Sequence, residues 1–306
     1  RASVGGPPEP AADQASQVLF GDPFILLHEG TYYMYGTSGE DGILVYKSSD
    51  MVNWEGPAGA RDGYALHKED VWGEKWFWAP EVYFRKGRFY MYFSAEEHIN
   101  AAVSDSPEGP FVQAEKAPML ESKAIDNHLF TDGDGTPYMY FVKFGEGLSV
   151  WVAEMNEDLL SFKKETMKQC IRQSQDWERR EGVVNEGPYV MERSGRYYMF
   201  YSGNGYTSQH YGVGFATADN PTGPWEKYPG NPILQSPDTL RGVGHGAFFE
   251  DASGKLQYVY HAHNSRKAIH PRKVYINECR FLEPEGADFP LPSMVPPRLA
   301  PVMRKD

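Results

Sequence analysis

Short apolar runs alternate along this chain with clusters of glycine, proline, asparagine and aspartate. In "GTYYMYGTS", which begins at Gly30, a turn residue is followed by a run rich in tyrosine and methionine. Such runs, bounded by turn residues, predict β-strands. Few segments longer than a turn show the apolar period of an amphipathic helix. The pattern therefore predicts an all-β protein.

The same pattern recurs at nearly constant intervals. Aromatic-rich strands follow five glycines: Gly30, Gly87, Gly135, Gly195 and Gly254. The spacings between these glycines are 57, 48, 60 and 59 residues. Another strand precedes each copy across a short turn, and a third strand follows it. Units of about four strands at this period are typical of propeller blades, whereas the rungs of a stacked solenoid are shorter. We predict a five-bladed β-propeller with about four antiparallel strands per blade.

The two ends of the chain differ from the repeats. Residues 1–16 hold one large aliphatic side chain, Val4, and predict a flexible leader. Residues 17–306 are then expected to form a single propeller domain. Its last part, "FPLPSMVPPRLAP", is rich in proline and predicts an extended strap or a frayed end.

Composition narrows the class of protein further. Of the 306 residues, 41% are hydrophobic, which is enough to bury a large core. The formal net charge of −12, without a run of Lys or Arg, disfavours binding to nucleic acid or to anionic membranes. No apolar run approaches the length of a membrane span. Cys170 and Cys279 lack metal-ligand spacing, and we expect free buried thiols.

Candidate chemistry follows from the repeat. The first strand of each propeller blade lines the central channel, so equivalent positions converge although they are far apart in sequence. Eight or nine residues before each repeat glycine lie Asp22, Trp78, Asp126, Glu186 and His245. Taken alone, each of the three acidic residues could equally serve a structural role in a turn or a cap. Three carboxylates crowded into one cleft would have divergent pKa values, as hydrolysis of a glycosidic bond requires.

The other candidates each allow two interpretations. Trp78 is either packing between blades or a flat surface for a sugar ring, and its place in the series favours the sugar. His245 is either a core histidine or a channel residue that contacts a central cation through water. His245, His261 and His263 offer a zinc set, which we disfavour because such spacing is common by chance. Arg272 is a solvated loop residue or a channel residue that bonds sugar hydroxyls.

At this point the chain resembles glycoside hydrolase family 43. The matching segments span residues 20–250: "GDPFILLHEGTYYMYGTS", "WAPEVYF", "AIDNHLF", "NEGPYV" and "GHGAFF". The resemblance implies a five-bladed propeller that hydrolyses α-L-arabinofuranosides, β-xylosides, arabinans or galactans with inversion. It implies no required cofactor.

The resemblance also implies roles for single residues. Asp22 matches the general base, Glu186 the general acid, and Asp126 the acid that tunes pKa and orients the substrate. His245 matches an axial histidine that lies by calcium or water in many members. Arg272 resembles a substrate-contacting arginine.

The chain departs from the family pattern in two respects. Asn127 stands where the family often has proline, and the neighbouring acid is nonetheless present. Few residues follow the last blade, so we do not expect the second β-sandwich domain that many members carry. We therefore expect propeller loops, such as 55–77 and 163–184, to form the pocket walls.

The leading hypothesis is an inverting, exo-acting α-L-arabinofuranosidase that acts on plant polysaccharides. A β-xylosidase, xylanase or galactan-active hydrolase of the same mechanism is the alternative, and a non-catalytic glycan-binding propeller is the alternative of another class. We expect an oligo- or polysaccharide substrate, a monomer, and a secreted or periplasmic location. A structural calcium ion at the propeller axis is compatible with His245.

Overall fold

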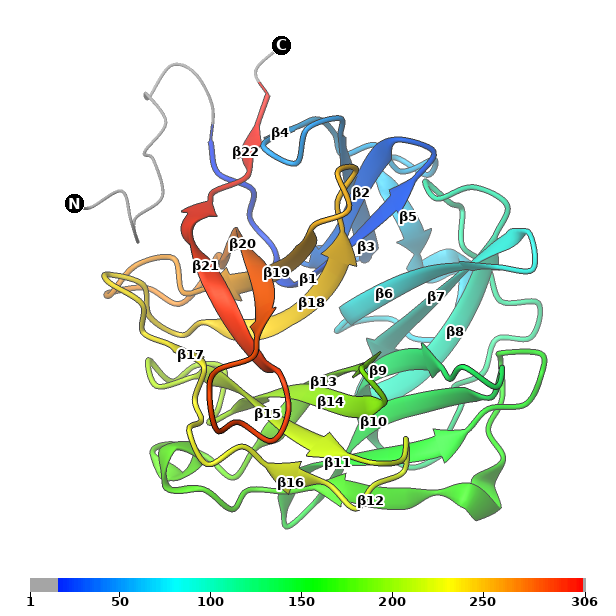
Figure 1. Cartoon of the computed structure of the whole chain (residues 1–306). Helices are drawn as coiled ribbons and strands as arrows, with labels where there is room; N and C mark the ends of the chain where they lie inside the picture. The colour runs from blue at the N-terminus through cyan, green and yellow to red at the C-terminus, as the bar shows by residue number, and fades with distance from the viewer. Residues whose placement is uncertain (1–15, 305–306) are drawn as a thin grey trace.

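The computed structural model describes residues 16–304, and its regular structure is almost entirely β-strand. Five sheets stand in a ring, and the ring runs from blue to red in chain order (Figure 1). The predicted five-bladed β-propeller is therefore confirmed. Apart from Ser16, the leader predicted for residues 1–16 lies outside the described residues.

Each blade is an antiparallel sheet of sequence-adjacent strands. Blade 1 contains β1 (Gly21–His28), β2 (Thr31–Thr37), β3 (Gly42–Ser48) and β5 (Tyr64–His67). Blade 2 contains β6 (Trp78–Arg85), β7 (Arg88–Ala95) and β8 (His98–Ser104). Blade 3 contains β9 (Ala124–Thr131), β10 (Pro137–Gly145), β11 (Gly147–Glu154) and β12 (Lys168–Ile171).

Blades 4 and 5 follow the same order. Blade 4 contains β13 (Asn185–Arg193), β14 (Arg196–Gly203), β15 (Gly212–Ala218), β16 (Glu226–Lys227) and β17 (Leu234–Gln235). Blade 5 contains β18 (Gly244–Glu250), β19 (Leu256–Ala262), β20 (Lys273–Leu282) and β21 (Leu291–Leu299). Three short 3-10 helices lie in loops: η1 (Lys68–Asp70), η2 (Lys164–Thr166) and η3 (Asp176–Arg179).

Blades 1, 3 and 5 have the expected four strands, and in blade 4 two short strands, β16 and β17, both pair with β15. Blade 2 has three strands, and an isolated bridge between Val103 and Val112 takes the place of the fourth. This single bridge leaves the outer edge of blade 2 short, which limits unwanted pairing with other chains.

Tight turns explain why the first two strands of three blades form hairpins. The pairs Glu29–Gly30, Lys86–Gly87 and Ser194–Gly195 all have positive φ at both residues. This is the geometry of a type I′ turn, whose twist matches that of the flanking strands. In these three blades the repeat glycine therefore marks the turn at which the chain reverses direction between the first and second strands.

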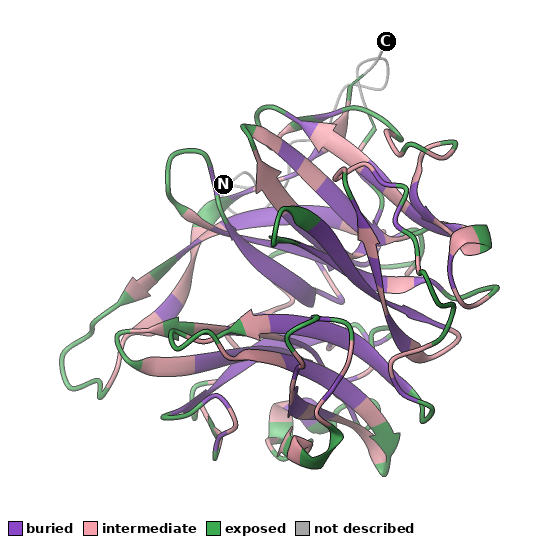
Figure 2. Cartoon of the chain, turned by 90° about the vertical axis from the view of Figure 1, so that its right-hand side faces the viewer, coloured by how far each residue is buried: buried purple, intermediate pink, exposed green. Residues whose placement is uncertain are grey.

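The core lies between the blades. Figure 2 shows that the strands are largely buried while the connecting loops are exposed. The main components of the core are buried tyrosine and phenylalanine side chains, such as Tyr35, Tyr92 and Phe141. Cys279 is buried and Cys170 half-buried, and both thiols are free.

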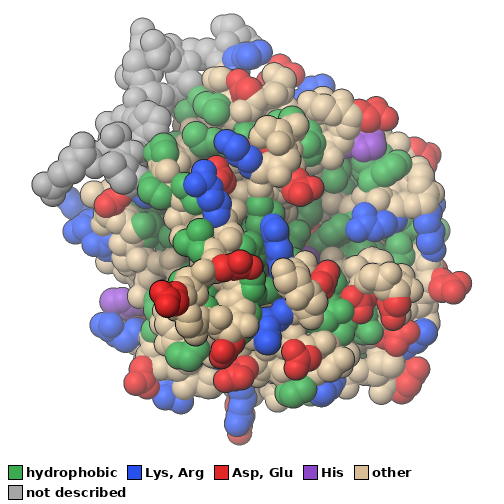
Figure 3. Space-filling model, viewed as in Figure 1, with side chains coloured by type: hydrophobic (Ala, Val, Ile, Leu, Met, Phe, Trp, Pro, Cys, Tyr) green, Lys and Arg blue, Asp and Glu red, His purple; other side chains and the backbone are tan. Residues whose placement is uncertain are grey.

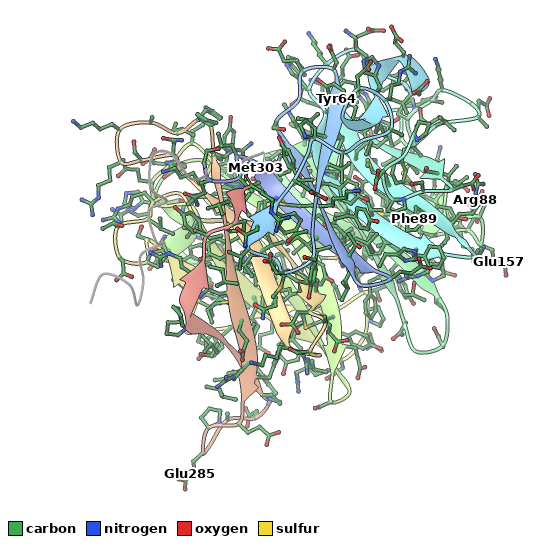
Figure 4. The ribbon with its side chains drawn as sticks, turned by 90° about the horizontal axis from the view of Figure 1, so that it is seen from above. Tyr64, Arg88, Phe89, Glu157, Glu285 and Met303 are labelled. Carbon is green, nitrogen blue, oxygen red and sulfur yellow. The ribbon has the colours of Figure 1, made fainter. Side chains whose placement is uncertain are left out.

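The ring closes through the two ends of the described chain. Strand β22 (Val302–Met303) pairs in parallel with β4 (Asn53–Trp54), next to blade 1. Figure 4 shows Met303 beside the blue strands of blade 1, whereas Glu285 lies at the tip of the β20–β21 hairpin. Most of the proline-rich end is therefore β21, the outer strand of blade 5, and residues 300–304 after it form a strap that joins blade 5 to blade 1.

The surface carries charges of both signs. On the face that Figure 3 shows, acidic and basic side chains are interspersed. Within residues 16–304, no helix has the length and apolar character needed to cross a membrane.

Candidate active site

The first strand of every blade carries a β-bulge near its start. The pairing of β1, β6, β9, β13 and β18 with the second strand shifts register there. In each bulge one residue has left-handed backbone geometry: Asp22, Ala79, Asp126, Gly187 and His245. That geometry is uncommon outside glycine, and bulges of this kind re-aim side chains beside active sites.

The predicted series follows this bulge with an offset in two blades. Trp78 and Glu186 lie one position before the left-handed residue of their blades, whereas the other three predicted residues occupy it. The structure nevertheless brings all six predicted site residues to one cavity of about 230 Å³. That cavity is lined by Asp22, Trp78, Glu97, Ile125, Asp126, Phe144, Leu148, Glu186, Tyr206, His245 and Arg272.

Each bulge is held by a side chain of the preceding blade. In four blades the backbone N–H of the left-handed residue donates to a side chain on the neighbour's second strand. The bonds join Asp22 to His261 (3.0 Å), Ala79 to Thr37 (2.8 Å), Asp126 to Ser94 (3.2 Å) and His245 to Ser202 (2.8 Å). In blade 4 the N–H of Gly187 donates to Asp126 Oδ2 at 3.0 Å. The five bonds form a closed ring around the axis, which we call the bulge ring.

Asp22 lies among positive charges and donors. Its Oδ1 is 3.0 Å from His245 Nδ1 and 3.4 Å from Arg272 Nη1, and Thr37 Oγ1 donates to Oδ2 at 2.7 Å. Burial alone would raise the pKa of Asp22, but Arg272 and His245 outweigh it and hold that pKa well below its ordinary value. Asp22 is therefore a carboxylate at neutral pH.

Glu186 lies in the opposite electrostatic environment. Burial, followed by the nearby charge of Asp126, raises the pKa of Glu186 to about 8. Tyr211 donates its hydroxyl to Glu186 Oε2 at 2.6 Å, which offsets part of that increase. Glu186 therefore retains a proton at neutral pH.

Asp126 and His245 lie between these two acids. Burial raises the pKa of Asp126, and the adjacent Asp22 adds to that increase. Burial disfavours the His245 imidazolium, yet Asp22 and Asp126 raise the pKa of His245 to about 10. His245 thus contributes a positive charge that separates the neighbouring carboxyl groups.

Arg272 is fixed against the start of β1. A Cβ added to Gly21 would lie 2.1 Å from the Arg272 guanidinium carbon, so only glycine leaves room for this arginine. The guanidinium also packs against the Tyr206 ring, 4.6 Å from its centroid. Arg272 is therefore a buried residue that lines the cavity, and not a solvated loop charge.

Sequence reasoning missed several residues of the site. Tyr211 contacts Glu186, Thr37 contacts Asp22, and Tyr206 and Phe144 line the cavity. Tyr211 lies directly before the third strand of blade 4, β15, and Thr37 ends a second strand, so neither lies in the first-strand series. Comparison of second-strand ends across the repeats would have revealed Thr37, Ser94 and Ser202 as hydroxyl residues at related places.

The wall loops were predicted only in part. Residues Glu74–Phe77, within the predicted loop 55–77, line a groove beside the cavity. The loop 163–184 lines neither the cavity nor the groove. The cavity is lined instead by Phe144 and Leu148 of the β10–β11 hairpin and by Tyr206. Asn127, in place of the family's proline, is buried and donates to the Asn100 carbonyl at 3.1 Å, away from the acids.

The zinc hypothesis does not agree with the histidine contacts. His261 Nδ1 accepts the Asp22 N–H, and His263 Nε2 bonds the Tyr206 carbonyl at 2.7 Å. Within residues 16–304, the group of potential ligands within 4.8 Å of one another is Asp126, Glu186 and His245. Calcium prefers six to eight oxygen ligands, so these three side chains do not fit a directly bound calcium ion. A cation that reaches His245 through water stays a prediction.

The model of glycosyl hydrolases family 43 matches residues 16–284 of this chain, and the chain therefore belongs to that family. The protein is a glycoside hydrolase of a family that cleaves O-glycosidic bonds with inversion and needs no cofactor for catalysis. The alternative of a non-catalytic binding propeller is not retained.

Three relatives illustrate the range of the family. A crystal structure described as an endo-1,4-beta-xylanase from Bacteroides thetaiotaomicron is 41% identical, with a TM-score of 0.89 over 96% of this chain and 100% of the other. The beta-D-galactofuranosidase xynD of Aspergillus niger is 26% identical over 89% of this chain and 82% of its own length. An extracellular exo-alpha-(1->5)-L-arabinofuranosidase, ArbA of Cellvibrio japonicus, is 26% identical over 82% of this chain and 81% of its own.

Proposed function

We propose that the protein is an inverting, exo-acting α-L-arabinofuranosidase that removes terminal arabinofuranosyl residues from plant xylan or arabinan. The observation that carries this proposal is the pair of oppositely shifted acids in one small cavity. Asp22 has a lowered pKa and Glu186 a raised pKa, and both side chains line the same cavity of about 230 Å³. Such a pair supplies a base and an acid at one pH.

The reaction assigns one proton transfer to each acid. Glu186 donates its proton to the glycosidic oxygen, which leaves as a hydroxyl group of the remaining glycan. Asp22 accepts a proton from water, and the resulting hydroxide attacks the anomeric carbon on the face opposite the leaving oxygen. One displacement inverts the configuration. Glu186 is then ionised and Asp22 protonated, and proton exchange with solvent returns both groups to their starting states.

The remaining residues support this exchange. Asp126 accepts the N–H of Gly187, directly after Glu186, and therefore positions the acid while its charge raises the pKa of Glu186. Arg272 and His245 keep Asp22 ionised. Arg272 also lines the cavity, and with Trp78 we assign it to contact with the sugar.

The size of the cavity supports exo action on a pentose. About 230 Å³ accommodates one sugar ring, whereas an endo enzyme has to hold sugars on both sides of the scissile bond. A β-xylosidase is the second candidate, because xylose is a pentose of the same size. The relative described as a xylanase favours a xylan-containing substrate. Because such polymers lie outside cells, we propose a secreted or periplasmic location, in line with a relative named as extracellular.

Paired substrates test the proposal. We would measure the release of 4-nitrophenol from the α-L-arabinofuranoside and from the β-D-xyloside, with Asp22→Asn as the inactive control. The proposal expects a higher kcat/KM on the arabinoside and an inverted configuration of the first sugar product by NMR. Turnover of the xyloside alone would change the substrate to xylose. Release from neither substrate, nor from arabinoxylan or arabinan, would overturn the proposed function.

A further inference from the structure

The strand that carries Glu186 is held on its inner edge by side chains. The first strand of each blade pairs with the second strand on one side and has no strand partner on the other. In β13, Gly187 and Val190 are buried, and buried backbone N–H groups need an acceptor. Asp126 Oδ2 accepts the N–H of Gly187 as part of the bulge ring, and His128 Nε2 accepts the N–H of Val190 at 2.9 Å. Strand β9 therefore holds β13 at two points shortly after Glu186.

A second contact fixes the tautomer of His128. A backbone N–H can only donate, so Nε2 is the acceptor and Nδ1 carries the imidazole proton. That proton faces Glu81 Oε1, which lies 2.9 Å from Nδ1. The Val190 carbonyl is farther from Nε2, at 3.4 Å. Tyr83 donates its hydroxyl to the same Glu81 oxygen, so Glu81 accepts two hydrogen bonds and holds His128 in the tautomer that bonds β13.

These contacts join three blades and lie outside the catalytic cavity. Glu81 lies on β6 of blade 2, His128 on β9 of blade 3 and Val190 on β13 of blade 4, and none of the three lines the cavity. His128 is 1% exposed and Glu81 8%. Burial of a carboxyl group and an imidazole costs more free energy than burial of apolar side chains of similar size. The hydrogen bonds that the two groups make therefore explain them better than packing does.

We propose that His128 and Glu81 are positioning residues for the general acid. Pairing of β13 with β14 is interrupted between Glu186 and Tyr189, and the side chains of β9 hold the strand at this interruption. The bond from Val190 to His128 thus fixes the backbone that directs Glu186. Small displacements of a catalytic group slow the step in which it takes part. This inference rests on the assignment of Glu186 as the acid in the proposed function, and it deepens that function.

Two amide variants of His128 separate its two hydrogen bonds. In His128→Gln the amide reaches the place of Nε2, so its oxygen can accept the Val190 N–H. In His128→Asn the shorter amide reaches the place of Nδ1, so the bond to Glu81 is kept and the Val190 N–H loses its acceptor. Both variants are measured on two glycosides of the sugar that the wild type releases, a methyl glycoside and a 2,4-dinitrophenyl glycoside.

The leaving group distinguishes a misplaced acid from a general loss of structure. His128→Asn should lower kcat/KM on the methyl glycoside by about 10-fold to 100-fold. On the dinitrophenyl glycoside, whose leaving group needs no proton, the loss should be less than about threefold, and His128→Gln should stay within about threefold of wild type on both. Glu81→Met, which leaves the tautomer of His128 free to change, should give an intermediate loss on the methyl glycoside. Tyr198→Phe removes a buried hydroxyl that bonds the Pro290 carbonyl from β14 of the same blade, and this matched control should change neither rate.

Hydrogen exchange tests the hold on β13 independently of activity. Mass spectrometry should show about tenfold faster exchange of β13 in His128→Asn than in wild type or His128→Gln. Equal losses on both glycosides, equal losses in the two amide variants, full activity of Glu81→Met, or unchanged exchange of β13 would overturn the inference. Exchange that differs as expected in proteins that hydrolyse no glycoside would instead overturn the proposed function and preserve the role of His128 in holding β13.

Discussion

Asp22 and Glu186 show how two carboxyl groups in one cavity acquire different chemical roles. Both are desolvated, which by itself would raise both pKa values. The difference arises from their immediate neighbours, because Arg272 and His245 face Asp22 while Asp126 faces Glu186. The assignment of base and acid therefore depends on these neighbouring charged residues as much as on the two carboxyl groups themselves.

Replacement of Glu186 by glutamine should make activity depend strongly on the leaving group. The amide keeps the size of the side chain but has no acidic proton. We expect kcat on an unactivated arabinoside to fall about 100-fold to 10,000-fold, the range for a lost general acid. A 2,4-dinitrophenyl glycoside, whose leaving group needs no proton, should lose far less. Asp22→Asn should impair both substrates alike, and a similar pattern for Glu186→Gln would contradict its role as the acid.

Tyr211 should control the alkaline side of the pH profile. The proposed mechanism requires protonated Glu186, so kcat/KM is expected to decline as the pH rises through about 8. The Tyr211 hydroxyl bonds the Glu186 carboxylate and lowers its pKa. Tyr211→Phe removes that bond, so the midpoint of the decline should move to higher pH.

The profile of Tyr211→Phe is measured from pH 4 to pH 10 beside wild type and Tyr197→Phe, whose hydroxyl instead bonds Asp132 outside the site. An alkaline midpoint that stays in place or moves to lower pH would refute the role of Tyr211.

At the scale of the strand, the site depends on a repeated irregularity. Five bulges place left-handed residues at the channel mouth, and the bulge ring ties each to the preceding blade. A regular strand would alternate side chains between its two faces. The bulges interrupt that alternation at the point where the acids face the cavity.

The bond from the His245 N–H to Ser202 offers a test of the bulge ring. Ser202→Ala leaves a buried N–H without its acceptor, and we expect the free energy of unfolding to fall by about 1–3 kcal/mol. Urea denaturation measures this. Ser161→Ala removes a hydroxyl that donates to exposed Asp158 and accepts from the Asn156 amide, which keeps its bond to the Phe162 carbonyl. This control should change stability by less than about 0.5 kcal/mol. Equal stability of the two variants would show that the bulge ring is not a structural constraint.

Strand patterns explain what could be predicted from sequence at this scale. Aromatic runs after turn glycines are local signals, and they identified the blades and the convergence of five of the six site residues. The sixth, Arg272, was predicted from the family resemblance. The bulges have no comparable signal, since Asp22, Ala79 and His245 adopt left-handed geometry without being glycine. The offset of Trp78 and Glu186 was therefore not visible. Contacts from outside the first strands, such as those of Tyr211 and Thr37, depend on tertiary packing and were missed for the same reason.

At the scale of the whole molecule, a propeller has to join its last blade to its first. Here the ring is closed by contacts among the strap, the segment before β1, and β4 with the residue before it. Four backbone hydrogen bonds join these pieces: Val18 to Pro301 (2.9 Å), Val302 to Val52 (2.8 Å), Met303 to Ser16 (2.6 Å) and Arg304 to Trp54 (2.6 Å). The family match ends at residue 284, so residues 301–304 lie beyond the matched segment, whereas their bonding partners lie within it.

Deletion of residues 300–306 should therefore weaken the whole ring. At about 1 kcal/mol for each backbone bond, the loss is about 4 kcal/mol, which lowers Tm on the order of 5 °C for a domain of this size. Val302→Pro removes the one donor that bonds Val52, and its Tm should lie between those of wild type and the deletion. Differential scanning calorimetry of the three proteins gives that order.

The deletion also bears on the site, because Val18 precedes Asp22 by four residues and the strap fixes its N–H. If the strap holds the ring closed, heat should inactivate the deleted protein at the same temperature at which it unfolds, since loss of closure frees the start of β1. Activity that survives above the calorimetric Tm of the deleted protein, or a Tm equal to that of wild type, would show that packing between blades 5 and 1 is sufficient to close the propeller.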